Sequence, residues 1–383
     1  MKTDTRFRIG RKLMLISLFF LIPDSLMLYL VITRLNADIG SARLEVHGNR
    51  YQRPLERLLA LIPEHHALST VPNADAGALK RVTAEIDRTF VDLSAIDAEL
   101  GGRLDFTAEG LAKRGRGHAN AAALATSWRE LVSDPGPIDG HRELIGAVRT
   151  MITHAGDQSN LILDPELDTY YLMDVTLLAL PQTQDRLAAI LARWHGATPA
   201  ELTASERAQL HVDVALLREA DLARVLASAN ACLQEDAGFH GTSPSLQERL
   251  PPMLAEYRAR TRDFIDLAAG IASSPSPVDA ARFVAAGSRA RAASFALWEV
   301  ASQELDVLLN ARISHLWWVR FFSLMAAAVT VVAAIAIVTF ITRSITLPLA
   351  RQAAKLATAN RELTAEIAER SRVEAQLRHA QKM

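Results

Sequence analysis

The stretch LWWVRFFSLMAAAVTVVAAIAIVTFI, residues 316–341, decides how the rest of the chain is organised. It carries a single charged residue, Arg320, near its start. A helix of this length rises about 1.5 Å per residue and exceeds the hydrocarbon core of a bilayer, which is about 30 Å thick. Trp317 and Trp318 stand where an aromatic anchor at the membrane surface is typical, and Arg320 can reach outward from one turn deeper. The stretch therefore predicts a transmembrane helix.

A second apolar stretch, LMLISLFFLIPDSLMLYLVI, predicts another span over residues 13–33. Its apolar part is too long for a cleaved signal peptide, and no Ala-x-Ala cleavage site follows closely. Basic residues lie on the terminal side of each span: Lys2, Arg6, Arg8, Arg11 and Lys12 before the first, and Arg343, Arg351, Lys355 and Arg361 after the second. The positive-inside rule then predicts a multi-pass protein of the bacterial inner membrane, with both ends (1–12 and 342–383) cytoplasmic and residues 34–315 periplasmic.

Pro23 and Asp24 interrupt the first apolar stretch. A carboxylate at membrane depth is costly, so Asp24 should face a partner helix or a water-filled gap. Two interpretations stay open. The pair is either a kink that relays motion across the membrane, which makes both residues part of a signal relay, or a polar contact between the two spans.

The composition favours helices and argues against nucleic-acid binding. The 383 residues have a formal net charge of −1, whereas nucleic-acid binders usually carry a basic excess. Ala and Leu are abundant and only 6% of the residues are aromatic, which favours helical bundles over β-sandwiches. The single cysteine, Cys232, excludes an intramolecular disulfide and a cysteine-based metal cluster. We expect it to be a small buried apolar residue.

Between the predicted spans, Pro and Gly separate amphipathic stretches with helical spacing, and no alternating strand pattern occurs. The predicted helices cover 74–100, 104–133, 138–163, 166–195, 201–235, 246–273 and 278–316, after a first helix that continues the span at 13–33 and is closed by Pro63 and Pro72. So many helices exceed a single four-helix bundle. The predicted fold class is all-α, with two transmembrane helices flanking a periplasmic helical sensor domain (a double four-helix-type bundle over 34–315), followed by a cytoplasmic coiled coil.

The stretch SNLILDPELDTYYLMD, residues 159–174, is the first candidate binding region. Asp164 and Pro165 end one helix and suit the start of the next, with Asp164 as its N-cap. Tyr170 and Tyr171 follow one turn later. One interpretation is a well-capped helix start with buried tyrosines; the other is the wall of a binding site with two phenols as polar handles.

The stretch EVHGNRYQRPLERLL, residues 45–59, is the second candidate region. Glu45, Gly48 and Tyr51 are spaced by three and share a helical face. Arg53 lies in a cluster with two neighbouring arginines and could hold a carboxylate in a bidentate manner, which slightly favours an anionic ligand. A solvated basic face is the alternative interpretation. The tentative ligand-binding residues are thus Glu45, Tyr51, Arg53, Asp164, Tyr170 and Tyr171.

The sequence predicts no catalytic residue, metal site or cofactor. His65 and His66 are adjacent and point in different directions on a helix, and no nearby ligand completes a metal set. The chain also has no P-loop, no dinucleotide glycine motif, no His-Glu-x-x-His motif and no nucleophile elbow.

After the second span, ITRSITLPLARQAAKLA resembles the start of a HAMP signal-relay segment, in which an Arg-Ser-Ile-Thr-x-Pro-Leu run leaves the membrane. This assigns residues 342–358 to a HAMP-like relay that includes Pro348. The remaining residues, 359–383, read as one helix. Leu349, Leu356, Leu363, Arg370 and Leu377 recur once per heptad. That pattern, with its one polar break, predicts a coiled-coil signalling linker and a parallel homodimer.

The ending SRVEAQLRHAQKM, residues 371–383, resembles the linker of sensor histidine kinases, especially hybrid ones, where it leads into the helix of the phosphoacceptor histidine. The pattern E-x-x-G-x-x-Y-x-x-P-L at 45–55 and DPELDTYYLMD at 164–174 resemble sensory regions of bacterial hybrid kinases and some methyl-accepting chemotaxis receptors. The resemblance implies a membrane-bound sensor of a two-component system. Its partners would be the lipid bilayer, a second copy, a small-molecule or protein ligand in the periplasm, and a response regulator reached only through output domains outside these residues.

The resemblance also implies autophosphorylation on histidine and transfer to aspartate. These residues contain neither a phosphoacceptor helix nor an ATP-binding domain, and His379 lacks the acidic neighbour of a phosphoacceptor. We therefore expect the sequence to end at a domain junction, as a truncated kinase, a fragment or a degenerate sensor. The alternatives are a chemoreceptor, a nucleotide-cyclising enzyme on the same sensor, and a stand-alone adaptor that dimerises with a full-length kinase.

Overall fold

The structure is a computed structural model that describes residues 4–70, 75–133, 139–194, 202–274, 278–341, 343–344 and 347–380. Side chains are described throughout these ranges except at 4–14, 16–18, 20, 139, 347, 350, 379 and 380. Every regular element in these ranges is a helix, which confirms the predicted all-α class. The chain divides into a larger unit, Asp38–Leu316, and a smaller unit, Met1–Ala37 with Trp317–Met383.

Two long helices contribute to both units. They are α1 (Asp4–Thr70) and α11 (Ala280–Ile341). The smaller unit also contains α12 (Leu347–Ala380). The other elements belong to the larger unit: α2 (Ala76–Leu100), α3 (Ala108–Lys113), α4 (Ala121–Ser133), α5 (Asp139–Gln158), η1 (Leu161–Leu163), α6 (Leu167–Met173), η2 (Asp174–Ala179), α7 (Leu180–Ala192), α8 (Ala204–Leu216), η3 (Leu217–Leu222), α9 (Ala223–Glu235), η4 (Asp236–Gly238) and α10 (Pro244–Ser273).

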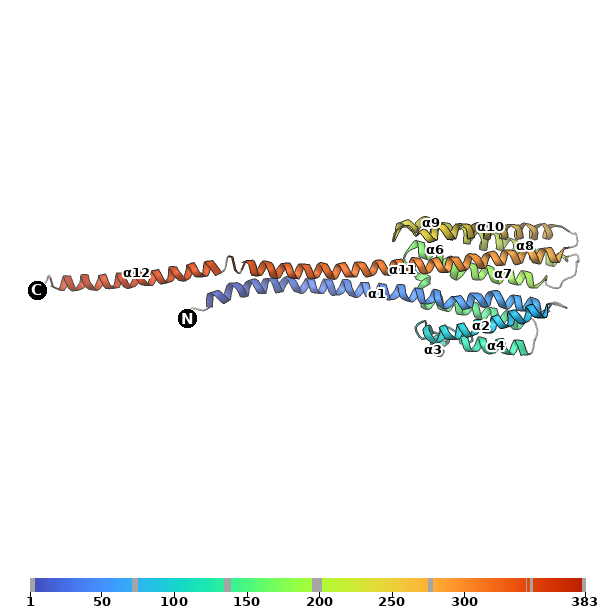
Figure 1. Cartoon of the computed structure of the whole chain (residues 1–383), viewed down its shortest axis with the longest axis horizontal. Coiled ribbons are helices and arrows are strands. Elements are labelled where there is room, and N and C mark those ends of the chain that lie inside the picture. The colour runs from blue at the N-terminus through green and yellow to red at the C-terminus, as the bar shows by residue number, and fades with distance from the viewer. Residues whose placement is uncertain are drawn as a thin grey trace. The chain divides into compact units, whose positions relative to one another are not determined.

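Within the larger unit, the shorter helices gather around the two long ones (Figure 1). Helices α2, α3 and α4 lie on the side of α1, and α7, α8, α9 and α10 lie on the side of α11. Helix α2 packs on α4 and α4 on α5, whereas α8 packs on α10 and α6 on α9. The amphipathic spacing of these helices turns their apolar faces inward, and the largest fully buried side chains include Trp128, Trp298, Tyr51, Tyr257, Phe264 and Phe283.

Two predicted helix boundaries were wrong. Helix α1 continues through Pro63 to Thr70, because the helix around this proline is buried against neighbours that hold it in place. The predicted helix over 104–133 is instead two helices, α3 and α4. The chain between them turns at Gly115, whose φ of +65° is open to glycine and strained for most other residues. Pro72 lies outside the described residues.

Two π-helical segments, η2 and η3, interrupt the helices predicted over 166–195 and 201–235. Pro181 follows η2 and has no N–H to donate to the preceding turn, which favours a wider local hydrogen-bond pattern there. Acidic residues of both segments accept charged hydrogen bonds: Asp174 from Arg224, at 2.5 and 3.2 Å, and Asp221 from Arg186, at 2.6 Å. These pairs join the helices on the α11 side of the larger unit.

Helix α11 is the one helix, within the ranges described above, that is long and apolar enough to cross a membrane. None of its most apolar stretch is buried against the rest of the described chain. The other predicted span, residues 13–33, is helical as part of α1, but several of its side chains lie outside the described set.

Helix α12 is a single helix with an unpartnered apolar series. Leu349, Leu356, Leu363, Ile367, Val373 and Leu377 are all exposed. Pro348 is the second residue of α12, where its missing N–H costs no hydrogen bond. Ile345 and Thr346 of the HAMP-like motif lie outside the described residues.

Candidate functional site

The two sequence motifs meet at a buried arginine, Arg312 of α11, which is only 5% exposed. Its guanidinium contacts carboxylates from both motifs. Nη1 donates to Glu45 Oε2 at 2.7 Å, and Nη2 donates to Asp164 Oδ1 at 2.5 Å. Nε lies 2.8 Å from Glu166 Oε2, and Nη2 also donates to Thr169 Oγ1 at 2.5 Å. We call Arg312, Glu45, Asp164, Glu166 and Thr169 the Arg312 cluster.

Glu45 brings α1 to this cluster. Burial raises its pKa from the ordinary 4.5 to about 7, helped by the nearby Asp164 carboxylate and opposed by Arg312. Ser41, one turn earlier on α1, lies 3.5 Å from the other carboxylate oxygen. Burial therefore favours the protonated form of this carboxyl more strongly than water would.

The turn after α5 brings Asp164 and Glu166 to the same arginine. The chain reverses at Asn160, whose left-handed φ of +63° suits asparagine better than most other residues. Asp164 Oδ1 accepts the backbone N–H of Glu166 at 3.0 Å, which fixes the turn before α6. Glu166 in turn lies 3.0 Å from Nε2 of His240, so the cluster extends to the loop before α10.

The cluster holds more acidic than basic groups. Asp168, also buried beside it, has its pKa raised to about 6 by burial, and by the Glu166 and Asp164 carboxylates against the pull of the Thr169 N–H. Burial also raises the pKa of Asp164, against the attraction of Arg312. For Arg312, burial favours the neutral form, but the surrounding carboxylates outweigh it and raise the pKa. The arginine is thus a fixed cation whose anionic partners belong to the chain itself.

Gly48 lets α1 approach this turn closely. A Cβ at position 48 would lie 2.2 Å from Ser159 Oγ and 2.4 Å from Ser159 Cβ. Any larger residue would push α1 away from the end of α5, and Glu45 with it. The E-x-x-G spacing in the first motif therefore places Glu45, which pairs with Arg312, one turn from Gly48, whose missing side chain leaves room for Ser159.

Tyr51 and Arg53 lie further along α1 with other partners. Tyr51 is fully buried, stacks on Phe106 with ring centroids 4.3 Å apart, and donates its hydroxyl to Asp97 at 2.6 Å. Burial raises the pKa of this phenol. Arg53 forms an ion pair with Asp306 of α11. Both side chains join α1 to neighbouring helices, and neither belongs to the Arg312 cluster.

Tyr170 and Tyr171 lie on α6 in an edge-to-face pair, with centroids 5.5 Å apart. Tyr170 is 38% exposed, and Tyr171 is partly buried against the core. The structure therefore separates the tyrosines of the second motif from its acidic half: Asp164 is in the cluster, while Tyr170 reaches the surface.

In the smaller unit, Asp24 of α1 lines a cavity of about 330 Å³ together with Ser25 and with Thr330 of α11. The Thr330 hydroxyl donates to the carbonyl oxygen of Ala327 at 2.8 Å. Pro23 lies within α1, which continues through it.

Arg312 was not among the predicted site residues. The signal was present in the sequence: Leu305, Leu308 and Arg312 follow the helical i, i+3, i+7 spacing, so the arginine lies on the apolar stripe of α11. A charged residue at such a position has to find buried partners. What the sequence could not indicate is which of the many acidic residues those partners are.

The described residues show no group of three or more His, Cys, Asp or Glu side chains arranged to hold a metal ion. Cys232 is buried, and burial raises the pKa of its thiol, so it is an unreactive core residue. Comparisons of the chain with protein-family models, curated proteins and solved structures gave no match.

Proposed function

We propose that this chain is the sensory and membrane-spanning part of a sensor histidine kinase, which passes a periplasmic signal to a cytoplasmic output outside these residues. The observation that carries the proposal is the Arg312 cluster. It ties α1, α11 and the turn before α6 together at one buried point. Helices α1 and α11 are the two that carry the apolar stretches, so a shift between them in the larger unit has a direct covalent route to the membrane.

The same proposal covers topology and assembly. Two spans, 13–33 and 316–341, place the larger unit in the periplasm as two helical bundles that share α1 and α11. The exposed apolar series on α12 supports a parallel homodimer in the cytoplasm, since such a series is normally covered by a second helix. A response regulator is then a partner only of the output domains.

The experiment joins a histidine-kinase catalytic core in frame after Met383 and measures its autophosphorylation in membrane vesicles. We expect Arg312→Gln to change the basal phosphorylation at least threefold, because the contact between α1 and α11 is altered. Arg50→Gln is the matched control, since Arg50 pairs with Glu99 on the exposed surface. Equal phosphorylation in all three proteins, at equal amounts in the membrane, would contradict the proposal.

Topology is tested separately with alkaline phosphatase inserted between residues 195 and 201 and fused at Met383. Activity at the first position and none at the second supports the periplasmic assignment. The reverse pattern would contradict it.

A further inference from the structure

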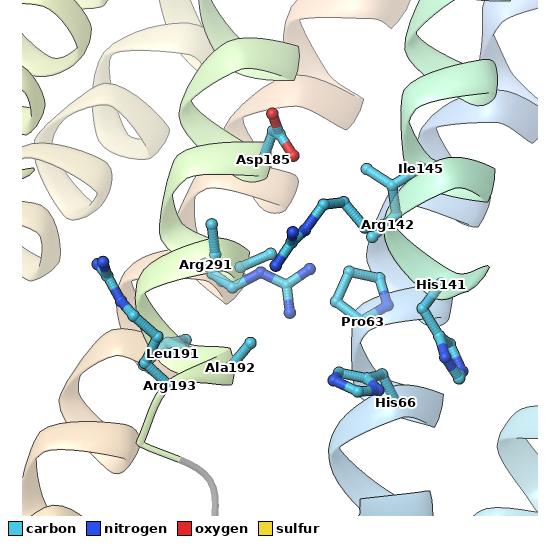
Figure 2. Close-up of a pocket in the computed structure, with 12 residues that line it drawn as sticks. Pro63, His66, His141, Arg142, Ile145, Asp185, Leu191, Ala192, Arg193 and Arg291 are labelled. Atoms are coloured by element: carbon cyan, nitrogen blue, oxygen red, sulfur yellow. The ribbon is translucent and has the colours of Figure 1, made fainter. Parts of the chain in front are cut away.

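A second arginine of α11, the partly buried Arg291, lines a cavity of about 410 Å³ in the larger unit (Figure 2). The cavity lies between four helices. These are the C-terminal parts of α1 and α7, the N-terminal part of α5, and α11. Along α11, Arg291 is about 30 Å from Arg312, at about 1.5 Å per residue. The cavity is therefore distinct from the Arg312 cluster.

Arg291 has no carboxylate within ion-pair distance among the described residues. Its Nη2 donates to the carbonyl oxygens of Leu59 and Ala60, at 3.1 and 3.4 Å, and its Nε donates to Gln184 Oε1 at 3.3 Å. Burial lowers its pKa to about 10, with a small opposing effect from Glu64, so the group stays charged at neutral pH. A partly buried cation gains from an anionic partner, and among the described residues no carboxylate approaches Arg291 within ion-pair distance.

Two acidic residues near the cavity are already engaged. Asp185, which lines it, pairs with Arg149, and Asp213 pairs with Arg193. Figure 2 shows the guanidinium groups of Arg142 and Arg291 approaching the same space from α5 and α11. The cavity thus presents the guanidinium of Arg291, at which no described carboxylate is directed, beside that of Arg142, an arrangement that suits the two oxygens of a carboxylate ligand.

The remaining lining is mostly apolar and uncharged. Pro63, Ile145 and Leu191 form part of the wall, together with the small side chains of Ala188, Ala189 and Ala192. Burial lowers the pKa of both His66 and His141, so these rings are neutral at neutral pH. A multiply charged phosphate ligand would leave this apolar wall unused. The volume lies in the range of small-molecule pockets, which are largely apolar with a few placed polar groups.

We propose that this cavity binds a small organic carboxylate, with Arg291 and Arg142 holding the carboxylate group and the wall of Pro63, Ile145 and Leu191 covering its apolar body. The binding site stands on its own geometry, and its role as the signal input rests on the proposed sensory function. A ligand at this position touches α1, α5, α7 and α11 at once, so its occupancy can favour one arrangement of α1 against α11.

The test uses the full chain in lipid nanodiscs and follows thermal unfolding and heat of binding. The probes are benzoate and isovalerate, each paired with its neutral amide and with sodium chloride at the same ionic strength. We expect at least one carboxylate to bind saturably and raise the unfolding midpoint, and neither amide nor chloride to do so. Inorganic phosphate is a further probe, and binding of phosphate alone would overturn the assignment to a carboxylate.

Variants then locate the site. Arg291→Gln and Arg142→Gln should weaken binding at least tenfold, whereas Arg116→Gln, which alters an ion pair with Asp157 outside the cavity, should not. Arg291 also bonds to the backbone of α1, so Ala189→Trp serves as a second variant. Ala189 is exposed at the cavity edge, and a large side chain there blocks the entrance without disturbing the core. Unchanged affinity in Ala189→Trp and Arg142→Gln, or no saturable binding of either carboxylate, would overturn the proposal.

This result is separable from that of the kinase fusion. If a carboxylate binds but phosphorylation does not change, the cavity is a binding site without a sensory role. If Arg312→Gln changes phosphorylation but no carboxylate binds, the proposed sensory function stands and the proposed binding site is wrong.

Discussion

Two arginines of α11, the buried Arg312 and the partly buried Arg291, differ in which group supplies the negative charge. Arg312 is surrounded by Glu45, Asp164 and Glu166, all from the same chain. Arg291 donates to carbonyl oxygens of Leu59, Ala60 and Gln184, lies over the ring of Phe295, and lines a cavity. The same residue type on the same helix is thus a closed structural junction at one position and an open binding group at the other.

This difference separates a charge that stabilises the fold from a charge that is available to a ligand. Burying a charge has a large desolvation cost, which partners within the fold can offset. When those partners are present, removing the charge leaves them buried without a counter-ion and destabilises the fold. When they are absent, the fold tolerates the charge at a cost, and an external anion can reduce that cost on binding.

The largest expected effect comes from Arg312→Met. The substitution leaves three carboxylates without their cation, and breaking a buried ion pair in this way costs about 3–5 kcal/mol. Denaturant unfolding of the full chain in nanodiscs measures the loss. Arg50→Met is the control, because its partner Glu99 is exposed and such pairs contribute at most about 1 kcal/mol. If Arg312→Met lowers the free energy of unfolding no more than the control does, Arg312 does not stabilise the fold as a buried ion pair.

Gly48→Ala tests whether α1 must approach the turn closely. The new Cβ would collide with Ser159, and overpacking of this kind costs about 1–3 kcal/mol. Gly40→Ala is a matched control on the same helix, since nothing lies within 4 Å of its Cβ. There alanine should stabilise the helix by up to about 1 kcal/mol. If both substitutions stabilise the chain, the close contact at Gly48 is not required.

The pH dependence of stability should have opposite signs at the two ends of the larger unit. The pKa of Glu45 is raised from 4.5 to about 7, so the folded chain binds the extra proton and stability falls as pH rises across that window. The pKa of His141 is lowered from 6.5 to about 4 by burial and by His66 and His65, so stability falls as pH drops across that window. Each group contributes a slope of up to about 1.4 kcal/mol per pH unit.

Two substitutions separate these contributions. Glu45→Gln keeps an acceptor for Arg312, and His141→Gln keeps a hydrogen-bonding group toward His65, which lies 3.0 Å away. The two contributions offset each other between pH 4.5 and 6.5 in the wild type. Over that range the unfolding midpoint should rise with pH in Glu45→Gln, where the His141 contribution remains, and fall with rising pH in His141→Gln, where the Glu45 contribution remains. Identical pH profiles in wild type and both variants would contradict the assigned pKa shifts.

The smallest effect on the larger unit is expected from α12. Leu363→Asp should leave the unfolding midpoint of the larger unit unchanged, because this side chain is exposed. It should instead lower disulfide cross-linking between copies that carry Leu356→Cys in a Cys232→Ser background. Glu362→Gln is the control. Equal cross-linking in all variants would contradict a coiled coil through this face.

The sequence predicted part of the candidate site because local patterns carry it. The spacing of Glu45, Gly48 and Tyr51 places them on one helical face, and the Asp164–Pro165 pair marks a turn. Both motifs were found this way, and Glu45 and Asp164 were selected from them. Arg312 was missed because its importance depends on contacts between segments that are far apart in sequence, and the cavity at Arg291 was missed for the same reason.

The sequence by itself determined the helical class, the apolar stretch of α11 and the amphipathic faces, since these follow from composition and from the helical period. Only the tertiary structure decided which acid meets which arginine. Many carboxylates and arginines are available, and their pairing is fixed by the packing of α1, α5, α7 and α11 rather than by any local spacing. Packing therefore gave Arg312 its counter-ions and left Arg291 facing a cavity.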